Sequence, residues 1–461
     1  MDSGTSPLAP APVAPGAMTF GIAVAATVAS LAGFLFGFDT VVISGAERRI
    51  QSLWGLTNAE HGFAIASALY GTVIGALFGS WPTDTLGRRR TLILIGLLYL
   101  TGALWSAFAA DVTGFVLARA IGGLGIGIST VAAPLYIAEI APPEYRGRLT
   151  GMFQFNIVFG ILVAFGSNAL LGGMGPQSWR WMLGVAALPS TAYLLLCLAL
   201  PESPRWLAIR AARAASPPRF VGIRVASAGS PADTAIAEGA VVRPAAQPAP
   251  RFPLFERAAR RPAALAMLIA FFNQLSGINS VLYFAPRIFE LAGLGPRAAL
   301  FQSLGIGITN LVFTFVGLWL IDRVGRRTLL LVGSVGYIAS LSLVSWAFFN
   351  NNVAYVPICV FLFIAAHAVG QGAVIWVFIA EIFPDNLRAR GQALGSSTHW
   401  IFAALLTTAF PAMVSRYEPG YTFAFFAVMM SAQLLWVIFM VPETRGVSFE
   451  TIQERLGGTQ L

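Results

Sequence analysis

The most concentrated polar chemistry of the chain lies in one segment of twelve residues inside a long apolar stretch. The segment, Phe272–Tyr283, reads FNQLSGINSVLY and sets amides and hydroxyls among hydrocarbon neighbours, among them Asn273, Gln274, Ser276, Asn279 and Tyr283. In a lipid-buried helix each unpaired polar group costs several kcal/mol. These side chains are therefore expected to face protein, water or a ligand.

Two of these amides are spaced so that a straight helix would separate them. Gln274 and Asn279 are five residues apart, which is about 140° around a helix. Gly277 lies between them and allows the helix to unwind, so both side chains could reach one cavity. Amides and hydroxyls that donate and accept in several directions suit an uncharged, polyhydroxylated solute. The alternative for each group is that it only joins helices by hydrogen bonds.

The composition indicates an integral membrane protein. Of 461 residues, 57% are hydrophobic and 11% are charged, whereas a soluble chain carries roughly a quarter charged residues. The net charge of +9 comes from 29 arginines, which fall mostly in loops between apolar stretches, where they set topology. No nucleic-acid partner is expected. Cys197 and Cys359 lie in apolar runs and offer neither a disulfide framework nor a metal-binding spacing, so no metal or cofactor is expected.

Twelve stretches are apolar and long enough to cross a bilayer as helices, which takes about twenty residues. They lie near 20–45, 61–81, 91–110, 113–139, 149–172, 180–200, 263–292, 299–320, 328–349, 353–380, 391–415 and 420–441. If both termini are inside, the cytoplasmic segments hold 22 arginines and the opposite loops hold six. This ratio predicts a multi-pass protein with both termini in the cytoplasm. The membrane is expected to be the plasma (inner) membrane.

Three motifs recur in the same order at nearly one offset. Asp84-Thr-Leu-Gly-Arg-Arg returns at Asp322, Ile137-Ala-Glu-Ile returns at Ile379, and Pro201-Glu-Ser returns as Pro442-Glu-Thr. The repeat predicts two homologous six-helix halves, as in transporters that move two bundles around a central site. The expected domains are a disordered cytoplasmic tail (1–17), an N-terminal bundle (18–200), a cytoplasmic linker with short helices (201–262), a C-terminal bundle (263–441) and a cytoplasmic tail (442–461).

The chain resembles a sugar porter of the major facilitator superfamily. The resemblance rests on DTLGRRR, DRVGRR, YIAEIAPPEYRGR, PESPRWL, QLSGIN, IAEIFPDNLRARG and PETRG, which cover nearly the whole chain apart from the tails and 214–250. It implies an all-α membrane protein with the major facilitator fold, twelve transmembrane helices in two pseudo-symmetric six-helix bundles.

The resemblance also implies a set of substrate contacts. They are Phe36, Gln154, Asn273, Gln274, Asn279, Tyr283, Asn310, Trp376, His399 and Trp400. A pyranose has a rim of hydroxyls and apolar C–H faces, so amides and flat aromatic rings suit it. Asn273 replaces a glutamine of the family pattern, and His399 stands where the family has Asn or Gln. Each aromatic residue could instead be packing, and packing is the expected role of His367.

Two opposite charges fall within spans of the first half, Asp39 and Arg119. Ionisable groups inside a membrane are costly and typically mark ion or proton pathways. In the proton-coupled relatives an aspartate and an arginine at these positions form the coupling pair, whereas uniporters carry a neutral asparagine in place of the aspartate. The alternative is a permanent salt bridge that never titrates.

Two matching charge sets lie at the expected cytoplasmic ends of the helices, and the resemblance implies that they form a cytoplasmic gate. They are Arg88, Arg89, Glu139, Arg146 and Glu202 in the first half, and Arg326, Arg327, Glu381, Arg388 and Glu443 in the second. Membrane-surface charge alone would explain the arginines but not the glutamates.

The sequence thus predicts a secondary active transporter that imports a monosaccharide, a hexose or pentose, by proton symport through alternating access. It is expected to work as a monomer in the lipid bilayer. A facilitative sugar uniporter is the nearest alternative, and a non-transporting sugar sensor is another. An enzyme is not expected, because the chain has no Ser/His/Asp, metal-binding or nucleotide-binding constellation.

Overall fold

The computed structural model describes residues 18–215, 257–383, 385–447 and 451–452, and over these ranges the chain is helical with no strand. The expected tail 1–17, the middle of the expected linker and the last nine residues lie outside this described part. Twelve helical stretches of the described residues are long and apolar enough to cross a membrane. The prediction of twelve spans is therefore confirmed.

Polar side chains fix where several helices begin. The Thr57 hydroxyl accepts a hydrogen bond from the Glu60 backbone N–H at 3.3 Å, and the Glu60 carboxylate accepts one from the Thr57 backbone N–H at 2.9 Å. This reciprocal capping box satisfies donors that the first turn leaves free. Asp111 caps the helix after it by accepting from the Gly114 N–H at 2.7 Å.

The first half contains ten α-helices and one short 3₁₀ helix. They are α1 (Phe20–Val42), η1 (Ile43–Gly45), α2 (Glu47–Leu53), α3 (Asn58–Phe78), α4 (Ser80–Thr85), α5 (Arg88–Phe108), α6 (Val112–Ile140), α7 (Arg146–Leu171), α8 (Ser178–Gly184), α9 (Ala187–Leu198) and α10 (Pro204–Ala215). The last of these, α10, is the amphipathic helix expected at the start of the linker.

The second half repeats the pattern. It contains α11 (Arg257–Leu275), α12 (Ile278–Tyr283), α13 (Ala285–Leu291), α14 (Pro296–Val324), α15 (Arg326–Phe349), η3 (Val353–Tyr355), α16 (Val356–Val369), α17 (Gln371–Ile382), α18 (Asp385–Arg416) and α19 (Pro419–Met440). The expected linker end at 262 falls inside α11, which begins at Arg257. Pro262 lies inside α11, where it lacks the N–H that would bond to the carbonyl four residues earlier.

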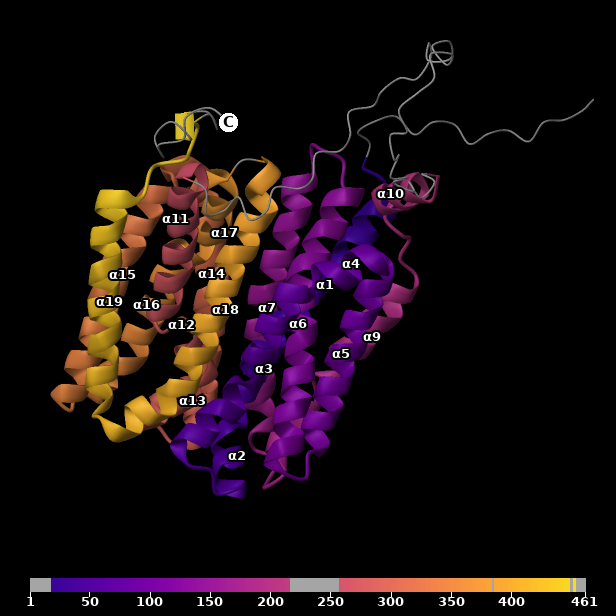
Figure 1. The fold of residues 1–461 in the computed structure, drawn as a ribbon. Coiled ribbons are helices and arrows are strands. Elements are labelled where there is room, and N and C mark those ends of the chain that lie inside the picture. The colour runs from indigo at the N-terminus through magenta and orange to yellow at the C-terminus, as the bar shows by residue number, and fades with distance from the viewer. Residues whose placement is uncertain (1–17, 216–256, 384, 448–450, 453–461) are drawn as a thin grey trace, which may run out of the picture.

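The two halves stand side by side as separate bundles, indigo to magenta and orange to yellow in Figure 1. The end of the molecule that carries α4 and α10 is called here the linker face, and the end that carries α2 and α13 is called the α2 face. The halves meet chiefly where α3 packs on α18 and α7 packs on α14. The major facilitator fold with two pseudo-symmetric bundles is confirmed.

Each copy of the repeated Asp-x-x-Gly-Arg-Arg motif turns the chain on a glycine with positive φ. Gly87 has φ +97° and Gly325 has φ +100°. A Cβ atom on Gly87 would stand 2.4 Å from Glu202 Oε2, and one on Gly325 would stand 2.5 Å from Glu443 Oε2. A side chain at either position is therefore excluded both by backbone strain and by the neighbouring carboxylate.

We expect Gly87→Ala to lower the apparent melting temperature of the purified protein by several degrees, because positive φ and the Glu202 contact both penalise a methyl group. The matched control is Gly147→Ala, where nothing lies within 4 Å of the added Cβ. The control should melt at the wild-type temperature or slightly above it, since alanine favours helix. Equal melting temperatures for the two variants would contradict the argument.

Candidate functional site

The seventh span is broken at Gly277, and the break brings separated amides together. α11 ends at Leu275, Gly277 adopts φ +83°, and α12 begins at Ile278. Asn279 Nδ2 donates to Gln274 Oε1 at 2.8 Å, although the two residues are five positions apart. The unwinding predicted at Gly277 is thus present, and it makes the two amides direct neighbours.

The amide cluster extends in both directions from Gln274. Gln274 Nε2 donates to Asn273 Oδ1 at 2.9 Å. The same nitrogen lies 3.1 Å from His399 Nε2 and 3.2 Å from His399 Nδ1, on α18. Because an amide N–H₂ can only donate, the ring nitrogen that it meets acts as an acceptor and carries no proton. Gln274 therefore links two helices of the second half through one side chain.

Aromatic rings surround His399. The Trp400 ring centroid lies 4.8 Å from that of His399, and the Trp376 centroid lies 5.2 Å away. Phe36, on α1 of the first half, lies 5.4 Å from Trp400. Trp400 Nε1 is buried and finds no hydrogen-bond partner among the described residues. The structure thus gathers amides, an imidazole and three aromatic rings at the boundary between the halves.

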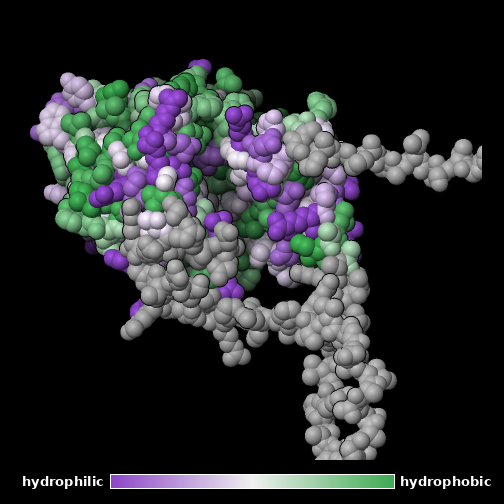
Figure 2. Space-filling model, turned by 90° about the horizontal axis from the view of Figure 1, so that it is seen from above, coloured by the Kyte–Doolittle hydropathy of each residue, from purple (hydrophilic) through white to green (hydrophobic). Residues whose placement is uncertain are grey.

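Apart from the aromatic rings just described, three of the expected substrate contacts have no hydrogen bond to this cluster. Gln154 is half-buried on α7 and Asn310 is buried on α14, two helices that pack together. The Tyr283 hydroxyl is buried and has no hydrogen-bond partner in the described part of the chain. α12, which carries Tyr283, contacts α1 of the first half. Viewed onto the linker face, the molecule is hollowed between its two halves (Figure 2).

Asp39 and Arg119 form a buried ion pair inside the first half. Arg119 Nη1 donates to Asp39 Oδ1 at 2.6 Å, and Arg119 Nη2 donates to the Asp39 carbonyl oxygen at 3.1 Å. Their exposed fractions are 6% and 2%. Asp39 Oδ2 is buried without a partner among the described residues. Asp39 lies on α1, the helix that contacts α12 of the broken span, so the ion pair is carried by a direct neighbour of that span.

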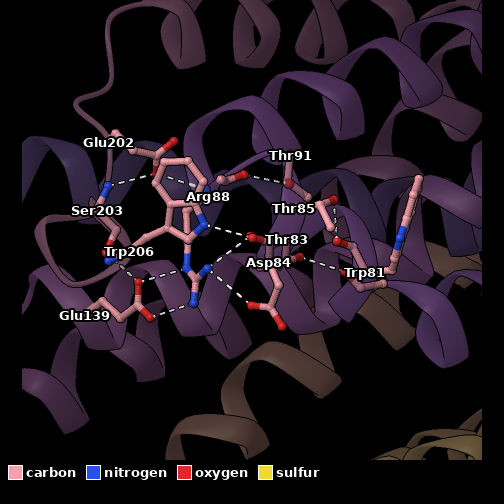
Figure 3. A network of polar contacts seen from close by, with 12 residues as sticks. Trp81, Thr83, Asp84, Thr85, Arg88, Thr91, Glu139, Glu202, Ser203 and Trp206 are labelled. Atoms are coloured by element: carbon pink, nitrogen blue, oxygen red, sulfur yellow. Dashed lines mark hydrogen bonds and ion pairs between the residues drawn. The ribbon is translucent and has the colours of Figure 1, made fainter. Parts of the chain in front are cut away.

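Arg88 organises the charge set at the linker face of the first half (Figure 3). Its Nε and Nη2 atoms donate to the two oxygens of Glu139 at 3.0 and 2.9 Å, and its backbone N–H donates to Glu202 Oε1 at 2.9 Å. Asp84 Oδ1 lies 3.3 Å from Nη1. The Ser203 hydroxyl completes the set by donating to Glu139. Such bidentate, charge-assisted contacts are stronger than neutral hydrogen bonds.

The second half reproduces this arrangement around Arg326. Its Nε and Nη2 atoms donate to the oxygens of Glu381 at 3.1 and 2.8 Å, and its backbone N–H donates to Glu443 Oε1 at 2.9 Å. Asp322 Oδ1 lies 3.0 Å from Nη1, and the Thr444 hydroxyl donates to Glu381 at 2.6 Å. Each of these contacts stays within its own half.

The remaining members of the two charge sets lie at the edges of these clusters. The backbone N–H groups of Arg89 and Arg327 donate to Glu202 at 3.2 Å and to Glu443 at 3.1 Å. Arg146 and Arg388 are exposed, and Arg388 Nε donates to the Ala380 carbonyl at 3.0 Å. The structure therefore joins eight of the ten expected gate residues into two clusters, one for each half.

Polar and close backbone contacts between the halves gather toward the α2 face. Asn58 Nδ2 donates to Ser415 Oγ at 2.8 Å, and the hydroxyls of Tyr70 and Thr408 lie 2.9 Å apart. α3 approaches α18 so closely that a Cβ atom on Gly62 would stand 1.9 Å from the Thr408 carbonyl oxygen. The α2 face is therefore the closed end of the molecule.

Sequence reasoning missed one group of residues at this closed end. Glu47 and Arg48 of α2 form ion pairs with Arg287 and Glu290 of α13, and His61 of α3 lies against Glu47. From the sequence alone, Arg48 and Arg287 count only among the six arginines assigned to the loops opposite the cytoplasm. The available signal was a histidine within an otherwise apolar span, at position 61.

Known proteins match this chain along nearly its full length. The family model for sugar (and other) transporters matches residues 25–456. The chain belongs to the sugar transporter family of the major facilitator superfamily. The resemblance found in the sequence is thereby confirmed, and this family is one of transporters, not of enzymes.

Three of the similar proteins illustrate the resemblance. The arabinose-proton symporter of Bacillus subtilis (strain 168) is 32% identical over 434 residues, covering 92% of this chain and 93% of that protein. The glucose transporter GlcP of Staphylococcus epidermidis is 33% identical over 433 residues, covering 93% of this chain and 95% of that protein. The inward open structure of the xylose transporter from E. coli superposes with a TM-score of 0.77 at 26% identity, covering 94% and 99% of the two chains.

Proposed function

We propose that this protein imports a monosaccharide, a pentose or a hexose, by proton symport through alternating access. The observation that carries the proposal is the buried cluster of three amides and His399 beside Trp376 and Trp400. Amides can pair with the hydroxyls of a sugar, and the indole faces can cover its C–H surfaces. The substrates named for the relatives include pentoses and a hexose, which leaves the individual sugar open.

The linker face is proposed to be the cytoplasmic side, with both termini in the cytoplasm and the protein acting as a monomer in the plasma (inner) membrane. The arginine-rich segments gather there, as topology requires. With the α2 face closed and the linker face hollowed, this conformation would present the site to the cytoplasm. The other conformation would open at the α2 face.

We expect Gln274→Leu to raise the half-saturating sugar concentration by about tenfold or more, because sugar hydroxyls would lose a buried amide partner. The measurement is counterflow of labelled glucose, galactose, xylose and fructose in proteoliposomes. Gln433→Leu is the matched control, since Gln433 is equally buried in the same half but donates to Ser334. The proposed site would be wrong if both variants changed the half-saturating concentration equally.

Asp39 and Arg119 are proposed to couple transport to protons. Protonation of Asp39 from outside would release it from Arg119 and permit sugar binding and closure, and deprotonation inside would restore the pair. Asp39 Oδ2, buried without a partner, is the atom best placed to receive the proton. One charge crossing about 100 mV is worth roughly 2.3 kcal/mol, which sustains on the order of fifty-fold accumulation.

Asp39→Asn is expected to abolish accumulation against a gradient while counterflow continues, because the amide cannot bind and release the proton. Accumulation is measured in proteoliposomes under an imposed proton gradient. The control is Glu144→Gln, which alters an exposed carboxylate outside the two charge clusters. Accumulation by Asp39→Asn would remove the coupling role, and failure of the wild type to accumulate sugar would favour a uniporter.

The two clusters around Arg88 and Arg326 are proposed to form a cytoplasmic gate. Each cluster lies at the open end of its own half in this conformation. When the linker face closes, the ends of the two bundles approach, and the charges of one cluster can meet those of the other. The gate would then hold the cytoplasmic side shut while the α2 face is open.

Glu381→Gln should therefore disfavour the conformation that is open at the α2 face. The readout is the rate at which a membrane-impermeant thiol reagent labels Thr408→Cys at the α3–α18 contact. We expect about a fivefold slower rate, which corresponds to about 1 kcal/mol. Glu144→Gln is the control, because it removes an exposed carboxylate that belongs to neither cluster. An unchanged labelling rate in Glu381→Gln would count against the gate.

A further inference from the structure

Two ion pairs join the two halves at the α2 face. The acidic residue is on α2 in one pair and on α13 in the other. Glu47 and Arg48 are adjacent on α2, and Arg287 and Glu290 are one turn apart on α13. Arg287 Nη1 lies 3.5 Å from Glu47 Oε2 and donates to Gln51 Oε1 at 3.0 Å, while Arg48 pairs with Glu290. These five residues are called the outer clasp.

The two ion pairs differ in how deeply they are buried. Arg48 is 61% exposed, so solvent screens its pair with Glu290. The Glu47 side chain is only 1% exposed and Arg287 is 17% exposed. A carboxylate as buried as Glu47 needs a counter-charge or a proton, because desolvation of an isolated charge costs several kcal/mol.

His61 supplies a second partner for this carboxylate. The imidazole is fully buried, with Nε2 at 3.0 Å from Glu47 Oε2 and 3.1 Å from the Glu47 carbonyl oxygen. His61 Nδ1 and Glu47 Oε1 are both buried without partners among the described residues. The ring meets Phe284 edge-on at 5.9 Å between centroids, so its other surroundings include apolar surface.

Charges on the surrounding elements do not replace Arg287. On α2, Arg49 is exposed, and on α3, Glu60 is bound by Thr57. α1 and α6 carry Asp39 and Arg119, which pair with each other, and Asp111, which caps α6. At the end of α18, Arg416 lies over the Tyr417 ring. Among the described residues, Arg287 is the only arginine within 4 Å of the Glu47 carboxylate.

We propose that His61 and Glu47 form a second proton-binding site, distinct from Asp39, which takes up a proton when the outer clasp opens. Glu47 and His61 belong to the first half and Arg287 belongs to the second. Separation of α2 from α13 therefore withdraws the cation and leaves the carboxylate with the imidazole alone. One proton from the outer solution converts this pair to imidazolium and carboxylate, and the return of Arg287 expels it.

The site makes the balance between the two conformations depend on the outer pH. Because the open state binds one proton more than the closed state, acid favours opening at the α2 face. Over the pH range in which the open state holds this proton and the closed state does not, the ratio of open to closed molecules should rise by up to tenfold for each unit that the pH falls. The effect needs neither sugar nor Asp39.

The test is a distance measurement between spin labels on Ser52→Cys and Ala298→Cys, two exposed positions near α2 and α13. Cys197 and Cys359 are replaced by alanine, and Asp39→Asn removes the other proposed proton site. Without sugar, from pH 8 to pH 5, we expect a long-distance population to grow as the pH falls. Gly62→Leu provides the open reference, because its side chain collides with α18.

His61→Gln and, independently, Glu47→Gln should each abolish this pH dependence. His367→Gln is the matched control, since that histidine bonds Tyr337 within the second half and should leave the response intact. A pH-independent population in the parent protein, or an unchanged response in either His61→Gln or Glu47→Gln, would overturn the proposal. Because no transport is measured, failure here is separate from failure of sugar or proton transport by the Asp39 assay.

Discussion

The left-handed conformation of Gly277 is the constraint on which the candidate site depends. It interrupts the seventh span and turns α12 so that Asn279 reaches Gln274. A Cβ atom at this position would stand 2.5 Å from the Phe426 ring, so packing as well as φ restricts it to glycine. The backbone groups freed by the break are held locally. The Ser276 hydroxyl donates to the Asn273 carbonyl at 2.6 Å and accepts from the Ile278 N–H at 3.3 Å. Such internal pairing is what allows a broken helix at membrane depth.

The two bundles are alike in fold, but they carry different buried polar groups. At the linker face the arrangement is nearly the same in both halves, down to the hydroxyls of Ser203 and Thr444 on the paired glutamates. Inside the bundles the halves differ. The first half holds the buried Asp39–Arg119 ion pair, and the second half holds the amide cluster and His399. The two kinds of chemistry are connected where α12, of the broken span, packs on α1, which carries Asp39. A movement of α1 at Asp39 can therefore reach the broken span through one helix contact.

The sequence predicted the parts of the structure that follow from periodic or repeated signals. Apolar length located twelve spans, the repeated motifs revealed two halves, and Gly277 between two amides indicated a break. The cost of charge in lipid singled out Asp39 and Arg119, and the family resemblance implied that they form a pair. The outer clasp could not be found in this way. Glu47 and Arg287 are 240 positions apart and belong to no repeated motif. Glu47 follows the expected span 20–45, and Arg287 lies near the end of the expected span 263–292. Only the tertiary arrangement brings them together.

Alternating exposure requires that the contacts closing each face be nearly equal in free energy, since a difference of a few kcal/mol would leave one conformation almost unpopulated. The α2 face meets this requirement through contacts of different strength. The exposed Arg48–Glu290 pair contributes about 0–1 kcal/mol, and the Asn58–Ser415 and Tyr70–Thr408 hydrogen bonds reform with water when the halves separate. The buried Glu47 is the exception, because water does not replace Arg287 in a desolvated setting. An adjacent imidazole that can accept a proton offsets this one cost. In the closed conformation Arg287 alone provides the counter-charge for Glu47. The imidazole of His61 is therefore needed only when the α2 face opens and Arg287 moves away.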